Sequence, residues 1–417
     1  MATTAPERRT APTAAAQRAG QDAQPPGPRP GGQDAQAVRA PVVTALHLSA
    51  FRALRALTVP LEPLTVVTGP GGSGRTSVVQ GYEALARLAA GAALDDVFAA
   101  GSGGPSPYVP QAARPDQQGR RGFRLGCAVA GPAGLLRFDV AVQAEPELRV
   151  VGERLTDAHG TTLLATALRD PARRAVEATC RAAGAARALR TPFPDDRLAL
   201  PLLPLRMAGT TRAERALLQA AEQVVVALRS AFGCDPVPAR MRKPVPVRDG
   251  MLRGDCANLA DVLRRTRAEC ATRHAALLAA VRDGCTGAVN DLRAEECGPG
   301  LVRAVLERER AGTVTPVAWL GDGELRFLAL ALVLLTGPGV LSVDTVDEVP
   351  AARRAMAVLA DGLDGGLDER RTAALLALAG RMCERGHVRL LATGPQGGLL
   401  AREAARREEV CLVDLGA

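Results

Sequence analysis

The sequence has very little lysine, histidine or aromatic residue, and each shortage narrows the function classes open to it. Lysine occurs once, at Lys243, so arginine carries almost all of the net charge of +8. Aromatic residues make up 2% of the chain, which disfavours a platform that stacks single-stranded bases. The nine cysteines form no CxxC pair and there are only four histidines. This argues against a zinc site and for reduced thiols.

Long apolar runs are missing as well. No stretch of about 18 apolar residues without charge occurs, so we expect no membrane span. The N-terminus has no apolar signal-peptide core, and we therefore expect a cytoplasmic protein. Hydrophobic residues still make up 47% of the 417 residues, enough for a sizeable core. The excess of basic over acidic residues is compatible with a nucleic-acid partner.

Both ends of the ordered chain alternate strands with helices, which predicts a mostly parallel sheet covered by helices. Strands are expected at 42–51 and 64–68, and a glycine loop and a helix of 13 to 15 residues follow the second. Toward the C-terminus we expect an apolar helix, a buried strand over 339–346 and a helix over 350–363. A helix, a strand, a short helix and a last strand complete the chain.

The first 40 residues and the middle of the chain differ from the segments that alternate strands with helices. Residues 1–40 are expected to be disordered, because 26 of the 40 are Ala, Gln, Pro or Gly. Residues 121–155 suggest a short antiparallel meander. Residues 156–300, rich in alanine and arginine, are expected to be mostly helical. Two basic stretches there could meet phosphates or be solvated helix faces: Arg169, Arg173, Arg174, Arg181, Arg187 and Arg190, and Arg240, Arg242, Lys243 and Arg248.

The glycine loop has the frame of a Walker A loop, in which small residues let backbone N–H groups surround phosphate oxygens at a helix start. The basic residue faces the β and γ phosphates and the next hydroxyl ligates Mg²⁺. Arginine stands where lysine is usual, and its planar fork cannot nest identically. The candidate nucleotide-binding residues are Gly69, Gly71, Gly72, Ser73, Gly74, Arg75, Thr76 and Ser77, with Thr76 also a metal ligand.

Two other interpretations of the loop remain open. Gly69, Gly71 and Gly74 also fit the G-x-G-x-x-G dinucleotide fingerprint, and Asp95 and Asp96 follow at about the distance of a ribose-binding carboxylate. That carboxylate should end a second parallel strand, however, and the residues before it contain no β-branched run. The loop could also be a glycine-rich turn without a ligand.

Residues 319–335 open with a glycine-flanked acidic turn before an apolar helix, and here the chain resembles a family. The resemblance is to the ABC-type ATPases of the RecF, SMC and OLD group in the AAA-family branch, over roughly 42–100 and 316–396 and more loosely elsewhere. The family's signature, L-S-[GD]-G-[EQT], completes the nucleotide site of another subunit. This chain reads Leu320-Gly321-Asp322-Gly323-Glu324, so Gly321 replaces the serine that would touch the γ-phosphate.

The family next carries a Mg²⁺-binding strand of four apolar residues followed by Asp-Glu, and two registers compete for it. The first ends at Asp344, with Thr345 in place of the catalytic glutamate. The second uses Asp347-Glu348 but buries a carboxylate in the strand. We prefer the first because an unpaired buried carboxylate is costly. Asp344 would then hold Mg²⁺ through water, and Asp347 or Glu348 could act only through an altered loop.

The family's γ-phosphate histidine is also absent, since the corresponding strand end reads Thr393-Gly394-Pro395. The lysine, the serine, the glutamate and the histidine used for hydrolysis are thus all altered. Losing one transition-state group costs about 10²–10³ in rate, so hydrolysis should be slow or absent.

The resemblance implies an α/β fold of the ABC-type P-loop class, with a short antiparallel meander and a helical insertion. It divides the chain into a tail (1–40), an N-terminal half of an ATP-binding domain (41–155), a helical lid or arm (156–300) and a C-terminal half (301–417). It implies ATP and Mg²⁺ as cofactors, a homodimer clamped by ATP, and a DNA or protein partner at the arginine-rich insertion. The first functional hypothesis is a slow ATPase in DNA maintenance or defence against foreign DNA. The second hypothesis is a scaffold that is gated by nucleotide binding and does not hydrolyse the nucleotide. The third is a dinucleotide-binding enzyme.

Overall fold

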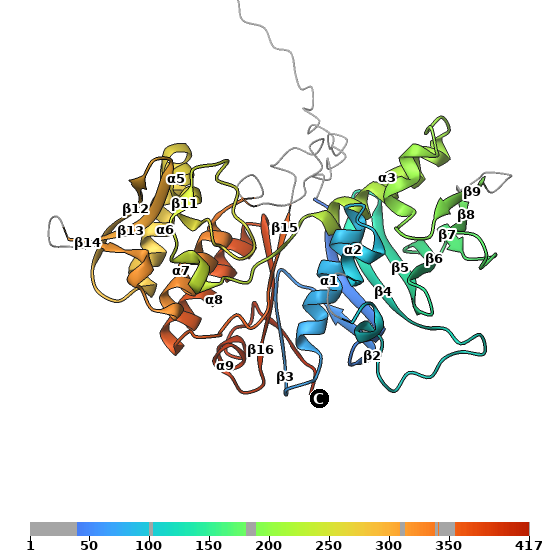
Figure 1. Ribbon diagram of the computed structural model, residues 1–417, viewed down its shortest axis with the longest axis horizontal. Coiled ribbons are helices and arrows are strands. Elements are labelled where there is room, and N and C mark those ends of the chain that lie inside the picture. The colour runs from blue at the N-terminus through green and yellow to red at the C-terminus, as the bar shows by residue number, and fades with distance from the viewer. Residues whose placement is uncertain are drawn as a thin grey trace, which may run out of the picture. The chain divides into compact units, whose positions relative to one another are not determined.

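The computed structural model describes residues 40–99, 103–180, 189–308, 313–337, 341 and 355–416, and these form three β-sheets (Figure 1). The sheet that positions the glycine loop is parallel and five-stranded, with the order β10-β15-β16-β3-β17. Its strands are β10 (Ala231–Gly233), β15 (Met356–Ala360), β16 (Val388–Pro395), β3 (Leu64–Gly69) and β17 (Cys411–Asp414).

The largest sheet of the described chain is antiparallel, with eight strands in the order β2-β1-β4-β5-β6-β7-β8-β9. From β4 to β9 the strands lie side by side in chain order, each antiparallel to the one before it. The strand β3, which lies between β2 and β4 in the sequence, belongs to the parallel sheet instead. The strands are β1 (Val42–Phe51), β2 (Leu54–Pro60), β4 (Arg121–Gly131), β5 (Gly134–Glu145), β6 (Arg149–Asp157), β7 (Thr162–Ala167), β8 (Ala175–Cys180) and β9 (Leu189–Pro194).

A smaller sheet and the helices complete the described fold. The small sheet pairs β11 (Val245–Pro246), β13 (Leu301–Arg308), β12 (Val289–Gly298) and β14 (Val314–Pro316). The helices are α1 (Arg75–Ala89), α2 (Leu94–Phe98), α3 (Arg212–Arg229), α4 (Pro238–Met241), α5 (Leu259–Glu269), α6 (Ala271–Gly284), α7 (Asp322–Leu335), α8 (Glu369–Glu384) and α9 (Leu399–Ala404). Short 3₁₀ turns are η1 (Ser106–Tyr108), η2 (Leu200–Leu205) and η3 (Val317–Trp319).

The parallel sheet separates two hydrophobic cores. Side chains alternate across a strand, so Val66 packs with α7 and α8 while Val67 packs with α1 and the antiparallel sheet. Figure 1 shows these two sets of elements on either side of β3, β15 and β16. Burial on both faces explains why β15 is a continuous apolar run and why every residue of β3 is buried.

The structure confirms the strand–loop–helix unit and the C-terminal alternation: β3 feeds the loop, α1 has 15 residues, and α8, β16, α9 and β17 follow in order. The antiparallel meander is present but much larger than predicted, so the prediction of a mostly parallel sheet is correct only for the five-stranded sheet. No helix in the described parts of the chain is both long and apolar enough to cross a membrane.

The prediction that residues 156–300 are mostly helical is wrong. The strands β7, β8 and β9 lie in this range and extend the antiparallel sheet, and β12 lies there as well. Helices are present, and α3 begins with a capping box in which Glu214 N donates to Thr211 Oγ1 at 3.1 Å. In β8 the side chains of Val176, Ala178 and Cys180 alternate into the core. Cross-strand pairing has outweighed the helical propensity of alanine.

The helix predicted over 350–363 is also wrong, since Met356–Ala360 is β15. All five of its residues are buried. A short apolar run without polar positions has the same appearance in a buried helix and in a strand buried on both faces. Of the strand predicted over 339–346, only Leu341 is described, and it forms a parallel bridge with Leu252 outside the three sheets.

Candidate functional site

The glycine loop leaves the carboxyl end of β3 and enters α1 without a side-chain cap. Gly72 and Gly74 have φ values of 82° and 96°, which favour glycine. Gly74 is the N-cap of α1, and within the loop Ser73 N donates to Pro70 O at 3.2 Å. The first N–H groups of a helix have no intrahelical acceptor, so this end offers donors and a positive dipole to an anion.

The front of the loop has room for a ligand, whereas its back is packed. A Cβ added at Gly71 or Gly72 would meet nothing within 4 Å. At Gly69 it would lie 2.5 Å from Ser73 Oγ, and at Gly74 it would collide with Leu54 of β2. Ser73 Oγ is buried and has no hydrogen-bond partner. An open front and an unsatisfied inner hydroxyl fit a phosphate group with acceptor oxygens.

The first three side chains of α1 differ in their exposure to solvent. Thr76 is exposed, Ser77 is buried and Arg75 lies between these extremes. Within the described residues, no hydrogen bond or ion pair holds the Arg75 guanidinium, which leaves its donors for an incoming anion.

A carboxylate lies at the same edge of the sheet, two strands from the loop. Asp361 directly follows β15, and Thr393 on the intervening β16 donates from Oγ1 to Asp361 Oδ1 at 2.5 Å. Thr393 Oγ1 also accepts from Gly362 N at 2.9 Å. Thr393 pairs with Val67, two residues before the loop. The parallel strands therefore bring this carboxylate and the loop to one edge.

Sequence reasoning missed Asp361, although a signal was present. The chain reads four apolar residues and Asp at Ala357–Asp361, the same pattern as the family's Mg²⁺-binding strand. Assigning this run to a helix hid the pattern. Asp344, Asp347 and Glu348, the residues proposed from the sequence, lie outside the described residues.

Glu83 on α1 is a second acidic group near this edge. Its Oε1 lies 2.5 Å from where a Cβ on Gly233, at the end of β10, would be. Burial raises the pKa of Glu83, and the negative charges of Asp361 and Asp235 raise it further, whereas Arg87 lowers it. Glu83, Asp235 and Asp361 therefore lie close enough to influence one another, and Arg326 pairs with Asp235 at 3.6 Å.

Glu83→Gln should stabilise the protein at alkaline pH. Because the folded-state pKa of Glu83 lies above its unfolded value, the folded protein holds the proton more strongly. Stability is therefore lost as pH rises from the ordinary glutamate pKa through the raised one. We expect Tm at pH 8 to rise by about 2 °C or more, with little change at pH 4.5. Thermal unfolding measures this, with Glu384→Gln on the exposed end of α8 as control. An equal shift at both pH values would contradict the prediction.

The signature-like residues form the start of α7. Gly321 is the N-cap, and its N–H donates to Glu324 Oε2 at 3.3 Å. A Cβ at Gly323 would collide with Gly366 O, so this glycine allows a close backbone approach. Arg242 Nη2 donates to Leu320 O at 2.8 Å and pairs with Asp322 at 2.6 Å. Arg242 thus fixes this turn rather than facing solvent as a free phosphate contact.

Most of the other described arginines in the basic stretches are also ion-paired. Arg169 pairs with Glu177, Arg173 with Asp170, Arg174 with Glu147 and Arg240 with Asp255. Arg181 and Arg187 lie outside the described residues.

The dinucleotide interpretation loses its carboxylate. Asp95 and Asp96 lie in the first turn of α2, not at the end of a parallel strand.

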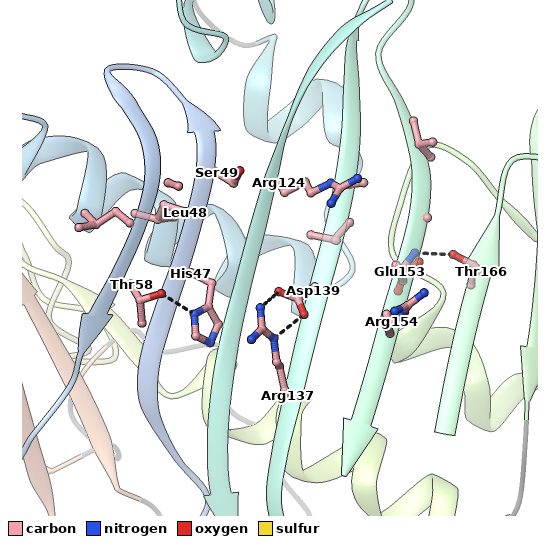
Figure 2. Close-up of a pocket in the computed structure, with 16 residues that line it drawn as sticks. His47, Leu48, Ser49, Thr58, Arg124, Arg137, Asp139, Glu153, Arg154 and Thr166 are labelled. Carbon is pink, nitrogen blue, oxygen red and sulfur yellow. Dashed lines mark hydrogen bonds and ion pairs between the residues drawn. The ribbon is translucent and has the colours of Figure 1, made fainter. Parts of the chain in front are cut away.

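A separate groove of about 650 Å³ lies on the face of the antiparallel sheet (Figure 2). Arg137 pairs there with Asp139 at 2.7 Å, and His47 Nδ1 lies 3.2 Å from Thr58 Oγ1. Burial, followed by Arg137, lowers the pKa of His47. None of the glycine-loop or signature residues lines this groove, so its volume does not make it the nucleotide site.

Comparison with known proteins gives structural neighbours only. No family profile matches the chain, and no curated protein does. It is similar to an SMC head bound to the C-winged helix domain of ScpA (11% identity, 87% of this chain, 92% of that one, TM-score 0.48). An SMC head from Thermotoga maritima has 11% identity, the same coverages and a TM-score of 0.40. The Pyrococcus furiosus Smc head with an extended coiled coil and bound ScpA C-terminal domain has 10% identity, the same coverages and a TM-score of 0.46.

Proposed function

We propose that the chain binds ATP with Mg²⁺ at the glycine loop, as an ABC-type P-loop protein. One observation supports this most: an open-fronted glycine loop and the Asp361 carboxylate lie at the same edge of one parallel sheet. Backbone amides of residues 71–76 and the Arg75 guanidinium would hold the phosphates. Thr76 and Asp361 would hold the cation, which supplies charge neutralisation between the phosphates.

In this proposal Asp361, rather than Asp344, takes the place of the metal-binding aspartate. Gly362 then occupies the position of the family's catalytic glutamate. Its φ of 59° is a conformation that favours glycine, so a side chain there would be strained. Glycine therefore stands at the positions of the catalytic glutamate (Gly362), the signature serine (Gly321) and the histidine (Gly394). None of these positions has a side chain that could assist attack by water. We propose slow hydrolysis at most.

The signature-like turn at α7 would act in a second copy of the chain. A clamp in which ATP joins the loop of one copy to the α7 start of another makes a homodimer the natural partner. A scaffold that binds nucleotide without turnover is the alternative within the same fold. A DNA or further protein partner remains part of the proposal, although the ion pairs of the described arginines reduce the charge available for it.

Calorimetry with ATP and Mg²⁺ tests the binding proposal, and NAD is the matched competitor. We expect binding of ATP, with no heat from NAD. Binding of NAD without ATP would overturn the proposal. A phosphate-release assay on the same protein separates slow turnover from none, since only a slow ATPase gives release above the background of buffer and ATP alone.

A further inference from the structure

Trp319 is the only tryptophan in the chain, and 77% of it is exposed. Its neighbours are not: Val317 and Leu320 are buried at 1% and 4% exposure. Among the large apolar side chains of the described residues only Leu205, at 79%, is more exposed. Leaving so large an aromatic side chain in water forgoes the free energy of burying it, unless another surface covers it.

The backbone that carries Trp319 is fixed. Arg242 Nε donates to Ala318 O at 3.1 Å, and its Nη2 donates to Leu320 O at 2.8 Å. One guanidinium therefore binds the backbone carbonyl groups of the residues before and after Trp319. Leu320 N donates to Val317 O at 3.1 Å. The side chain is therefore presented on an ordered turn, which lowers the entropy cost of docking.

The surface beside Trp319 complements the charge of the glycine-loop face. Asp322, three residues on, pairs with Arg242 but remains 69% exposed. On the loop side the exposed Arg55 follows Leu54, the residue that packs behind Gly74. An indole face attracts a guanidinium, and a carboxylate beside it adds to the attraction.

We infer that Trp319 is an anchor for a second copy of this chain, and that it packs on the copy's glycine-loop face near Arg55. The inference rests on the proposed ATP-dependent dimer and adds the residue that docks. In a two-fold dimer each contact occurs twice, so both tryptophans become covered together. Tryptophan and arginine are the residues most enriched at the centres of such interfaces.

The single tryptophan makes its own environment measurable. We expect acrylamide to quench Trp319 fluorescence strongly in the nucleotide-free protein. With Mg²⁺ and a slowly hydrolysed ATP analogue, the quenching constant should fall about twofold or more. This fall should grow with protein concentration, because it follows dimer formation rather than nucleotide binding.

Sedimentation of variants supplies the second measurement. Trp319→Ala should weaken the analogue-dependent dimer about 30-fold or more, as expected for an interface anchor. Leu205→Ala, a matched loss of an exposed apolar side chain, should change it by less than twofold. Calorimetry at a concentration where the protein is monomeric should give the same analogue affinity for all three proteins.

The outcomes separate this inference from the proposed function. A chain that binds no analogue overturns both. A chain that binds the analogue but keeps Trp319 fully quenchable, or a Trp319→Ala variant that dimerises like the parent, overturns only the role of Trp319. If Leu205→Ala weakened the dimer as much as Trp319→Ala, that would also overturn it. The loss of any exposed apolar side chain would then have the same effect.

Discussion

Asp361→Asn should weaken ATP binding in Mg²⁺ by about 10- to 100-fold and leave the affinity measured in EDTA nearly unchanged. The carboxylate directly follows β15 at the edge where the glycine loop begins, and Thr393 holds it at 2.5 Å. Asparagine keeps the oxygen that accepts from Thr393 but loses the negative charge that would stabilise a cation. Titration with a fluorescent ATP analogue, in Mg²⁺ and in EDTA, measures both affinities.

Asp344→Asn is the matched control, because the sequence alone favours Asp344 for the same role. It should leave the Mg²⁺-dependent part of the affinity within about twofold. If Asp344→Asn removes the Mg²⁺ effect and Asp361→Asn does not, the assignment made from the sheet is wrong. Thermal unfolding of both variants checks that neither acts through global instability.

The glycine loop could be predicted from sequence because its determinants are local. A β-branched strand, glycines where the backbone needs positive φ, and an amphipathic helix follow one another within residues 64–89. Each element carries its own signal, and the three signals agree. Gly72 and Gly74 have the φ values that such a loop requires, and neither depends on a distant part of the fold for its identification.

Asp361 is harder to place from sequence, because its local pattern becomes informative only once Met356–Ala360 is known to be a strand beside β16. The apolar run Met356–Ala360 is compatible with a helix or a strand, and only its pairing with Val388–Ala392 decides between them. The desolvation argument that favoured Asp344 compared two registers of one segment. It could not detect a third segment that long-range pairing brings to the edge.

The prediction that residues 156–300 are mostly helical failed for a related reason. Alanine and arginine favour helices locally, yet β7 and β8 pair with neighbours in a sheet that starts at residue 42. A period-two burial pattern is present in Ala175–Cys180, but six residues give a weak signal beside a long alanine-rich context.

Arg75→Ala should weaken ATP binding about 10- to 150-fold, the usual cost of losing a hydrogen bond to a charged group. The guanidinium lies at the first residue of α1 and has no hydrogen bond or ion pair within the described residues, so its removal breaks none of these. The folded state should therefore keep its Tm. Arg87→Ala, in the last turn of the same helix, removes an equal charge farther from the loop and should leave the affinity within about twofold.

Arg75→Lys separates charge from shape. If arginine replaces lysine only through the arginine bias of this chain, the variant should bind ATP within about threefold of the parent, since the cation is retained. Its turnover should stay low, because Gly362 still presents no carboxylate to an attacking water. A large rise in phosphate release from this single change would show that the lysine alone was limiting. The replacements at Gly321, Gly362 and Gly394 would then be compensated elsewhere in the chain or by a second copy.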